Sequence, residues 1–77
     1  MNTTYTKQER DFLKEIGHRI REARQNLGQS QETFAKTCKL DRTYISDVER
    51  GERNISLLNL KKTSNALGIP IYHLLGV

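Results

Sequence analysis

The residues of this chain that could take part in chemistry are two arginines and two hydroxyl side chains at helical spacing. Arg42, Thr43, Ser46 and Arg50 would share one face of a helix, because helical residues three and four apart are neighbours. An arginine bonds guanine through two parallel donors and also bonds phosphate, and short hydroxyl side chains bond base edges. This face therefore indicates binding to double-stranded DNA.

The segment that must position this face covers residues 30–51 and reads SQETFAKTCKLDRTYISDVERG. We expect one helix over 31–38, capped by Ser30, and a second over 42–50, capped by Asp41. Three or four residues are too few to join antiparallel helices, so the pair must cross steeply, as in a helix-turn-helix. The positions that would face a shared core are small or apolar: Phe34, Ala35, Cys38, Leu40, Ile45 and Val48.

One long helix is expected before this segment. Thr6 and Glu9 have the spacing of a capping box, and Gly28 follows the last apolar position as a C-terminal stop signal. One face carries an apolar residue at every third or fourth position: Phe12, Leu13, Ile16, Ile20, Ala23 and Leu27. Residues 1–5 are expected to be loose.

Two further helices are expected after it. Ser56 caps a helix over 57–67 that Gly68 ends, and Pro70 suits the first position of a helix over 70–75. No segment alternates between apolar and polar residues, so no strand is expected. The expected fold class is all-α, with five helices in a single domain over residues 1–77.

Composition supports an anionic partner and argues against an enzyme. The net charge is +4 and the isoelectric point about 9.5, although such a charge is also ordinary for solubility. Cys38 is the sole cysteine, which excludes an internal disulfide and fits a reducing, cytoplasmic setting. No apolar run reaches the length of a membrane span. His18 and His73 lack metal-ligand companions and no glycine-rich phosphate loop is present, so we expect no metal, cofactor or catalysis.

From Ile16 to Leu75 the chain resembles the lambda-repressor-like (Xre-type) helix-turn-helix family. The resemblance rests on GHRIREARQNLGQSQETFA, YISDVERG and NALGIPIYHLL. It implies a five-helix DNA-binding domain whose second and third helices form the motif. One departure is Lys39, where family members often have glycine in a left-handed backbone conformation. A lysine in that conformation costs about 1 kcal/mol relative to glycine.

Within that family, the stretch LDRTYISDVERGERNISLLNL is most similar to the controller proteins of restriction-modification systems. The resemblance implies a small homodimer that binds operators ahead of its own gene and the endonuclease gene, as activator or repressor. Activation would need contact with RNA polymerase, and no surface for it is identifiable in the sequence. Two alternatives stay open: a phage or mobile-element repressor, and an antitoxin-like module that holds another protein.

The expected DNA contacts follow from positions in and around the third helix. Arg42 and Thr43 lie in its first turn and would read bases. The resemblance implies that Gln31 bonds a phosphate and braces the start of that helix. We interpret nine residues as DNA-binding: Gln31, Arg42, Thr43, Tyr44, Ser46, Asp47, Arg50, Arg53 and Asn54.

Several members of this set have more than one reading. Ser46 would reach a base or a phosphate, and the Tyr44 hydroxyl would bond phosphate or its ring would pack on the domain. Asp47 would accept from cytosine, or it would lie solvated and keep the helix from binding every sequence, and the solvated role is favoured. Arg50, Arg53 and Asn54 would bracket the DNA backbone.

Two further sets have other expected roles. The resemblance implies that Arg24 and Glu49 form a mostly buried structural ion pair rather than a catalytic site. A surplus of apolar side chains on the last two helices predicts a homodimer interface, because exposed apolar clusters mark contact surfaces. Its expected members are Leu57, Leu58, Ile71, Tyr72 and Leu75.

Overall fold

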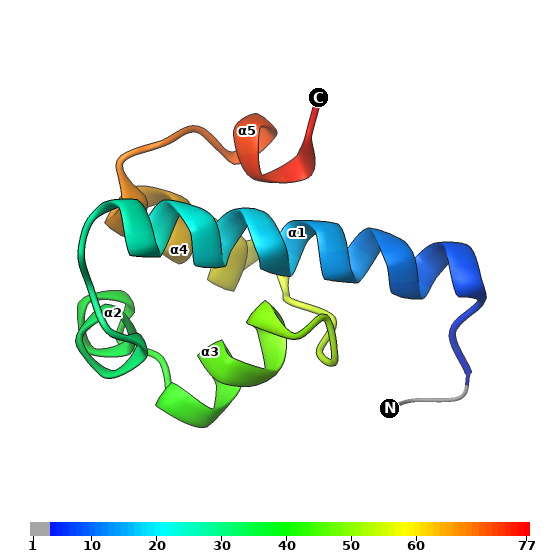
Figure 1. Cartoon of the computed structure of the whole chain (residues 1–77), viewed down its shortest axis with the longest axis horizontal. Coiled ribbons are helices and arrows are strands. Elements are labelled where there is room, and N and C mark those ends of the chain that lie inside the picture. The colour runs from blue at the N-terminus through cyan, green and yellow to red at the C-terminus, as the bar shows by residue number, and fades with distance from the viewer. Residues whose placement is uncertain (1–3) are drawn as a thin grey trace.

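The computed structural model describes residues 4–77, which form five α-helices (Figure 1). The helices are α1 (Lys7–Asn26), α2 (Gln31–Cys38), α3 (Arg42–Glu49), α4 (Leu57–Leu67) and α5 (Ile71–Leu75). No strand occurs in this part of the chain, so the all-α prediction is confirmed. None of these helices is long and apolar enough to cross a membrane.

α1 begins at the predicted capping box. The Thr6 hydroxyl accepts from the Glu9 amide at 3.1 Å, and the Glu9 carboxylate accepts from the Thr6 amide at 2.9 Å. Residues 1–3 of the segment expected to be loose lie outside the described residues. Tyr5 departs from that expectation, because it is half-buried and its carbonyl accepts from Arg10 Nη1 at 3.0 Å.

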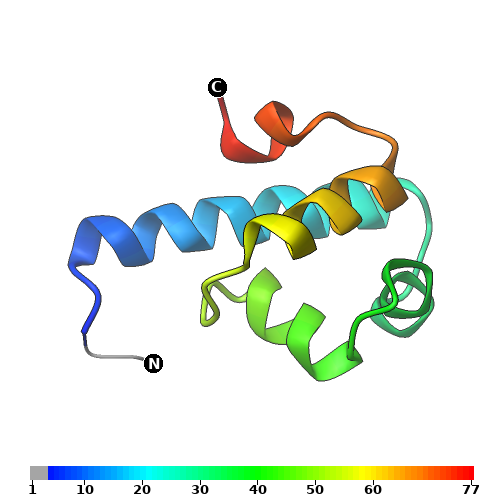
Figure 2. The same cartoon turned by 180° about the vertical axis from the view of Figure 1, so that it is seen from behind.

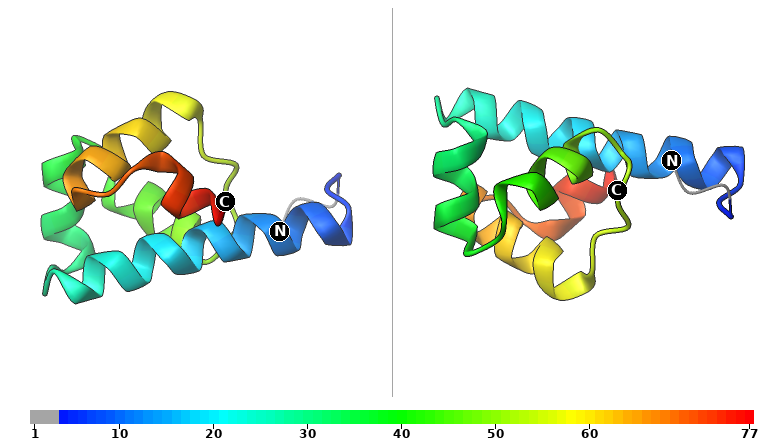
Figure 3. Two further views of the ribbon diagram at one scale, coloured as in Figure 1. Left: turned by 90° about the horizontal axis from the view of Figure 1, so that it is seen from above. Right: turned by 90° about the horizontal axis from the view of Figure 1, so that it is seen from below.

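α1 is the long axis about which the other helices are arranged. Figures 1 and 2 show α2 and α3 on one side of α1 and α5 on the other, with α4 packed against α1. The two views of Figure 3 show the N-terminal turns of α1 projecting beyond the other helices. All five helices contribute to one core: Ile16, Ile20, Phe34, Ala35, Cys38, Ile45, Val48, Leu60, Leu67 and Leu74. The core therefore holds the helix-turn-helix against α1 and α4.

The turn between α2 and α3 has the predicted backbone. Lys39 lies in the left-handed region (φ 58°, ψ 43°), and the Leu40 amide donates to the Ala35 carbonyl at 2.9 Å. In Figure 1 α2 is seen nearly end-on while α3 runs across the picture, so the two helices cross steeply. Asp41 holds the N-cap position of α3 but makes no side-chain capping bond, which leaves its carboxylate exposed.

Gly17 fixes how closely α1 approaches α3. A Cβ atom there would lie 2.2 Å from the Val48 carbonyl oxygen and 2.7 Å from the Glu49 carbonyl oxygen. Both contacts are shorter than real Cβ atoms allow, and backbone oxygens cannot turn aside as a flexible side chain can. Glycine is therefore required where the end of α3 meets the middle of α1.

The structure differs from the sequence expectations at the ends of helices and at the margin of the core. Phe12 and Leu27 are 48% and 50% exposed. Phe12 lies at the edge of the apolar face, since the adjacent Leu13 is buried, and Leu27 follows the last turn of α1. α3 ends at Glu49, and Arg50 is its C-cap rather than its last residue. Pro70 is extended (ψ 154°), so it precedes α5 instead of opening it. Leu40 is half-buried at the rim of the core.

Candidate nucleic-acid interface

The first turn of α3 presents two free polar side chains. Figures 1 and 2 show that α3 begins at the edge of the molecule farthest from α1 and ends against α1. Arg42 and Thr43, at that outer edge, are exposed. Neither side chain has a hydrogen bond or ion pair with another residue in 4–77. Both are therefore available to a ligand that approaches the start of α3.

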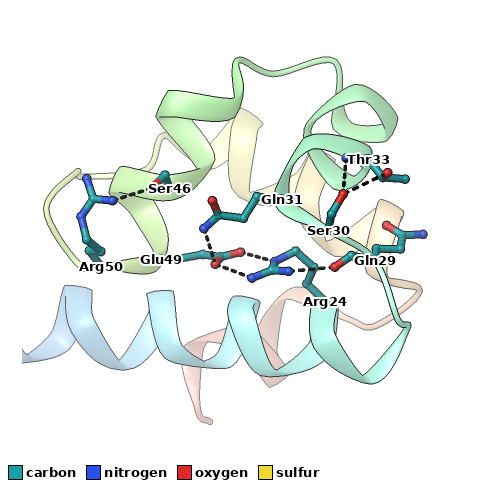
Figure 4. Close-up of polar contacts among 8 residues, drawn as sticks. All are labelled: Arg24, Gln29, Ser30, Gln31, Thr33, Ser46, Glu49 and Arg50. Atoms are coloured by element: carbon teal, nitrogen blue, oxygen red, sulfur yellow. Dashed lines mark hydrogen bonds and ion pairs between the residues drawn. The ribbon is translucent and has the colours of Figure 1, made fainter.

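The opposite end of α3 is anchored by a buried ion pair. Arg24 Nε lies 2.7 Å from Glu49 Oε2, and Arg24 Nη2 lies 2.9 Å from Glu49 Oε1 (Figure 4). The two side chains are only 9% and 2% exposed. Arg24 Nη1 also donates to the Gln29 carbonyl at 2.7 Å. The pair therefore ties α1 to α3 and to the loop before α2.

Gln31 completes this network in a different way from the one expected. Its side-chain amide donates to Glu49 Oε1 at 3.0 Å (Figure 4), so it braces the end of α3 rather than its start. The reason is the steep crossing, which brings the N-terminus of α2 beside the last turn of α3. Its expected phosphate contact stays a prediction.

A polar hollow of about 380 Å³ lies beside the buried pair. Its lining comes from α1, α2 and the end of α3: Arg21, Arg24, Gln31, Ser46, Glu49 and Arg50. The Glu49 carboxylate neutralises Arg24, and Asp47 and Glu52 pair with Arg50, so Arg21 supplies the remaining positive charge beside the N-terminus of α2. Helix N-termini and arginines both suit an oxyanion such as phosphate. Arg21 was missed in the sequence, although its place one helical turn before Arg24 could have indicated it.

Asp47 is not the solvated residue that was favoured. It is 25% exposed, and its Oδ1 lies 2.5 Å from Arg50 Nη2 while its Oδ2 lies 3.7 Å from Arg53 Nη2. Arg50 also donates from Nη1 to the Ser46 hydroxyl, as Figure 4 shows, and from Nε to Glu52 Oε1 at 3.1 Å. The two arginines expected to bracket DNA are thus held by acceptors of the chain itself.

Tyr44 both packs and bonds within the domain. Its hydroxyl accepts from the Asn59 side chain at 3.0 Å, and the Arg53 guanidinium carbon lies 4.9 Å from its ring centroid. Asn54 is exposed, and it lines a smaller hollow with Tyr5, Glu9, Phe12 and Leu13 at the start of α1. Neither arrangement tests the DNA contacts expected of these residues.

The residues expected at a dimer interface fall into two groups. Leu57, Leu58 and Tyr72 are 81%, 77% and 62% exposed. Ile71 and Leu75 are half-buried and pack against the core beside the buried Leu74. Figures 1 and 2 place α5 on the far side of α1 from α3, so a partner covering α5 would leave the start of α3 open.

Three further side chains could take part in chemistry: Cys38, His18 and His73. Burial raises the pKa of the Cys38 thiol to about 11, against the opposing effect of the Lys62 charge, so the thiol is neutral near pH 7. His18 and His73 are exposed, and His18 lies 3.5 Å from Glu22. The described residues contain no group of three or more His, Cys, Asp or Glu that could hold a metal ion.

Comparison with known proteins identifies the family. Residues 20–74 match the helix-turn-helix family. A hypothetical transcription factor of Neisseria meningitidis serogroup B is 46% identical over 67 residues, which are 87% of this chain and 63% of that protein. The chain thus spans less than two thirds of that relative.

Two solved structures extend the comparison. The restriction-modification controller C.AhdI from Aeromonas hydrophila is 48% identical with a TM-score of 0.79, over 80% of this chain and 94% of that one. The controller C.Esp1396I, solved as a tetramer with its natural 35 base-pair operator, is 31% identical with a TM-score of 0.75, over 83% and 88%. The chain therefore belongs to the helix-turn-helix family of transcription regulators, as the sequence resemblance predicted, and restriction-modification controllers are among its relatives.

Proposed function

We propose that this chain is a sequence-specific DNA-binding regulator that controls a restriction-modification system by occupying its own promoter and that of the endonuclease gene. The observation that carries the proposal is the asymmetry of α3. Its outer end offers Arg42 and Thr43 without a partner in 4–77, and its inner end is fixed by Glu49. A reading helix needs free donors at one end and a rigid attachment at the other. The operator complex of the related controller C.Esp1396I supports this reading.

Different residues would contact the bases and the phosphates. Arg42 would bond the two acceptors of a guanine, and Thr43 would bond a base edge or touch a thymine methyl group. Gln31 and Arg21 would hold phosphate at the polar hollow, where the N-terminus of α2 adds its amides. These phosphate contacts set the position of α3 in the major groove and carry no sequence information themselves.

A second copy of the chain is the proposed partner at α4 and α5. Leu57, Leu58 and Tyr72 expose apolar surface there, and covering it in a symmetric dimer would remove that surface from water. Such a dimer would place two copies of α3 in successive major grooves, about 34 Å apart. The site of action is the compartment that holds the operator DNA, the bacterial cytoplasm. No surface in 4–77 is assigned to RNA polymerase.

The experiment compares Arg42 with Arg21. Both are exposed, and neither forms a hydrogen bond or ion pair with another residue in 4–77. An operator selected from a random duplex pool and a scrambled duplex are titrated at several salt concentrations. Arg42→Ala should lose about 1–3 kcal/mol on the operator and little on the scrambled duplex. Arg21→Ala should weaken both duplexes by a similar factor and reduce the salt slope by about 1.

Two results would count against the proposal. If Arg42→Ala weakens both duplexes equally, α3 does not read bases through its first turn. If the parent chain prefers no duplex, sequence-specific regulation fails, and the antitoxin-like alternative then gains.

A further inference from the structure

The loop that follows α3 is electrically balanced within the chain itself. Four charged side chains meet there, two acidic and two basic: Asp47, Arg50, Glu52 and Arg53. Every nitrogen of the Arg50 guanidinium faces an acceptor, since Nη2 bonds Asp47, Nε bonds Glu52 and Nη1 bonds the Ser46 hydroxyl. The part of the molecule expected to attract the DNA backbone thus has no net charge.

Asp47 is the centre of this cluster. One of its oxygens contacts Arg50 at 2.5 Å and the other contacts Arg53 at 3.7 Å, so a single carboxylate holds both arginines. Asp47 also follows Thr43 by one helical turn, which places the carboxylate on the face of α3 expected to meet DNA. In the DNA-free chain the two arginines neutralise this carboxylate, and without them it would repel the phosphates.

We propose that Asp47 acts as an internal substitute for DNA phosphate, which limits the affinity of this chain for DNA of any sequence. In the DNA-free chain it occupies Arg50 and Arg53. On binding, the two arginines exchange the carboxylate for phosphate oxygens, which are acceptors of the same charge and similar geometry. The net electrostatic gain is small, so the bases read by Arg42 and Thr43 decide where the chain binds. The inference rests on the proposed function and adds the residue that restrains its sequence-independent component.

The test removes one charge at each of two positions on the same helix. Asp47→Asn keeps the side-chain shape and releases both arginines. Asp41→Asn is the matched control, because Asp41 is an exposed acid at the N-cap of α3 with no side-chain capping bond. Asparagine caps helices as well as aspartate does, so the control leaves α3 intact.

The expected result is a stronger and more salt-dependent interaction for Asp47→Asn with both duplexes. Asp47→Asn removes the carboxylate that the two arginines leave unpaired when they move to phosphate, so the slope of log K against log salt steepens by about 1 and the gain grows about fourfold between about 200 and 50 mM salt. Asp41→Asn should leave that slope unchanged within about half a unit. In an Arg50→Gln, Arg53→Gln background, Asp47→Asn should no longer steepen it.

Three outcomes would overturn the inference. The two aspartate variants could change affinity and slope equally, which would reduce the effect to net charge. Asp47→Asn could weaken binding to the operator alone, which would make Asp47 a base-reading residue. It could also keep its full effect without the two arginines. All comparisons on the scrambled duplex hold even if the parent lacks sequence preference, so failure of the proposed function is seen separately.

Discussion

The buried pair between Arg24 and Glu49 makes the sharpest stability prediction. Arg24→Ala removes two bonds to the Glu49 carboxylate, at 2.7 and 2.9 Å, and one to the Gln29 carbonyl. It leaves a carboxylate that is 2% exposed with the Gln31 amide as its remaining side-chain partner. An uncompensated charge at such a site cannot recover the hydration it lost on folding.

The expected loss in the free energy of unfolding is about 3–5 kcal/mol, the usual cost of removing one partner of a buried pair. A domain of this size has about 4–12 kcal/mol of total stability, so the variant should be close to unfolded near 37 °C. At about 4–8 °C per kcal/mol, the melting temperature should fall by at least about 12 °C. The double variant Arg24→Met, Glu49→Leu leaves no stranded charge and should recover most of this loss.

Urea unfolding and thermal melts followed by circular dichroism would measure these changes. All variants should be compared at one protein concentration, because a dimer links stability to concentration. Lys7→Ala is the control, since it breaks a 2.9 Å ion pair with Asp11 that is largely exposed. It should melt close to the parent, because exposed pairs contribute little. An Arg24→Ala chain that melts within about a degree of the parent would show that the pair does not stabilise the fold.

Three further predictions address packing, assembly and the thiol. Gly17→Ala should lower the free energy of unfolding in urea by about 1–3 kcal/mol, because its Cβ would overlap the Val48 carbonyl oxygen. This loss should outweigh the better helix propensity of alanine, and unchanged stability would contradict the close approach of α1 to α3. Tyr72→Glu should sediment as a monomer, whereas Phe12→Glu, another exposed aromatic, should stay a dimer; equal behaviour of the two would remove the assigned interface. Burial raises the pKa of Cys38 from 9.0 to about 11, so folding favours the neutral thiol. The free energy of unfolding should be unaffected by this thiol below pH 9 and should fall by about 3 kcal/mol as the pH rises through 11. A Cys38→Ala chain should lack that part of the decline, and parallel pH profiles of the two chains would show that the thiol does not titrate as described.

The parts of the fold that depend on neighbouring residues could be predicted from the sequence. The capping box of Thr6 and Glu9 joins residues three apart, and the left-handed turn at Lys39 is a property of a short segment. The core positions of the helix-turn-helix also follow from helical period alone. Periodicity states which face of α1 is apolar but not how much of that face the other helices cover, so Phe12 was placed wrongly beside the buried Leu13.

The parts of the site that depend on distant residues could not be predicted in the same way. The contact from Gln31 to Glu49 spans 18 residues and follows from the crossing angle of α2 and α3. The need for glycine at position 17 is set by two carbonyl oxygens on another helix. Asp47 was predicted to be solvated because Arg50 and Arg53 were assigned to the DNA backbone. Their contact with Asp47 depends on the path of the loop after α3, which the sequence does not state.

In the proposed function, α3 reads DNA sequence in a symmetric dimer. Selection of binding sites by the parent chain from a pool of random duplexes measures this property itself. The expected result is an enriched operator with two inverted half-sites whose centres lie about 34 Å, one helical turn, or a multiple of this apart. A pool that shows no enriched sequence after repeated rounds, or a single unpaired half-site, would contradict it.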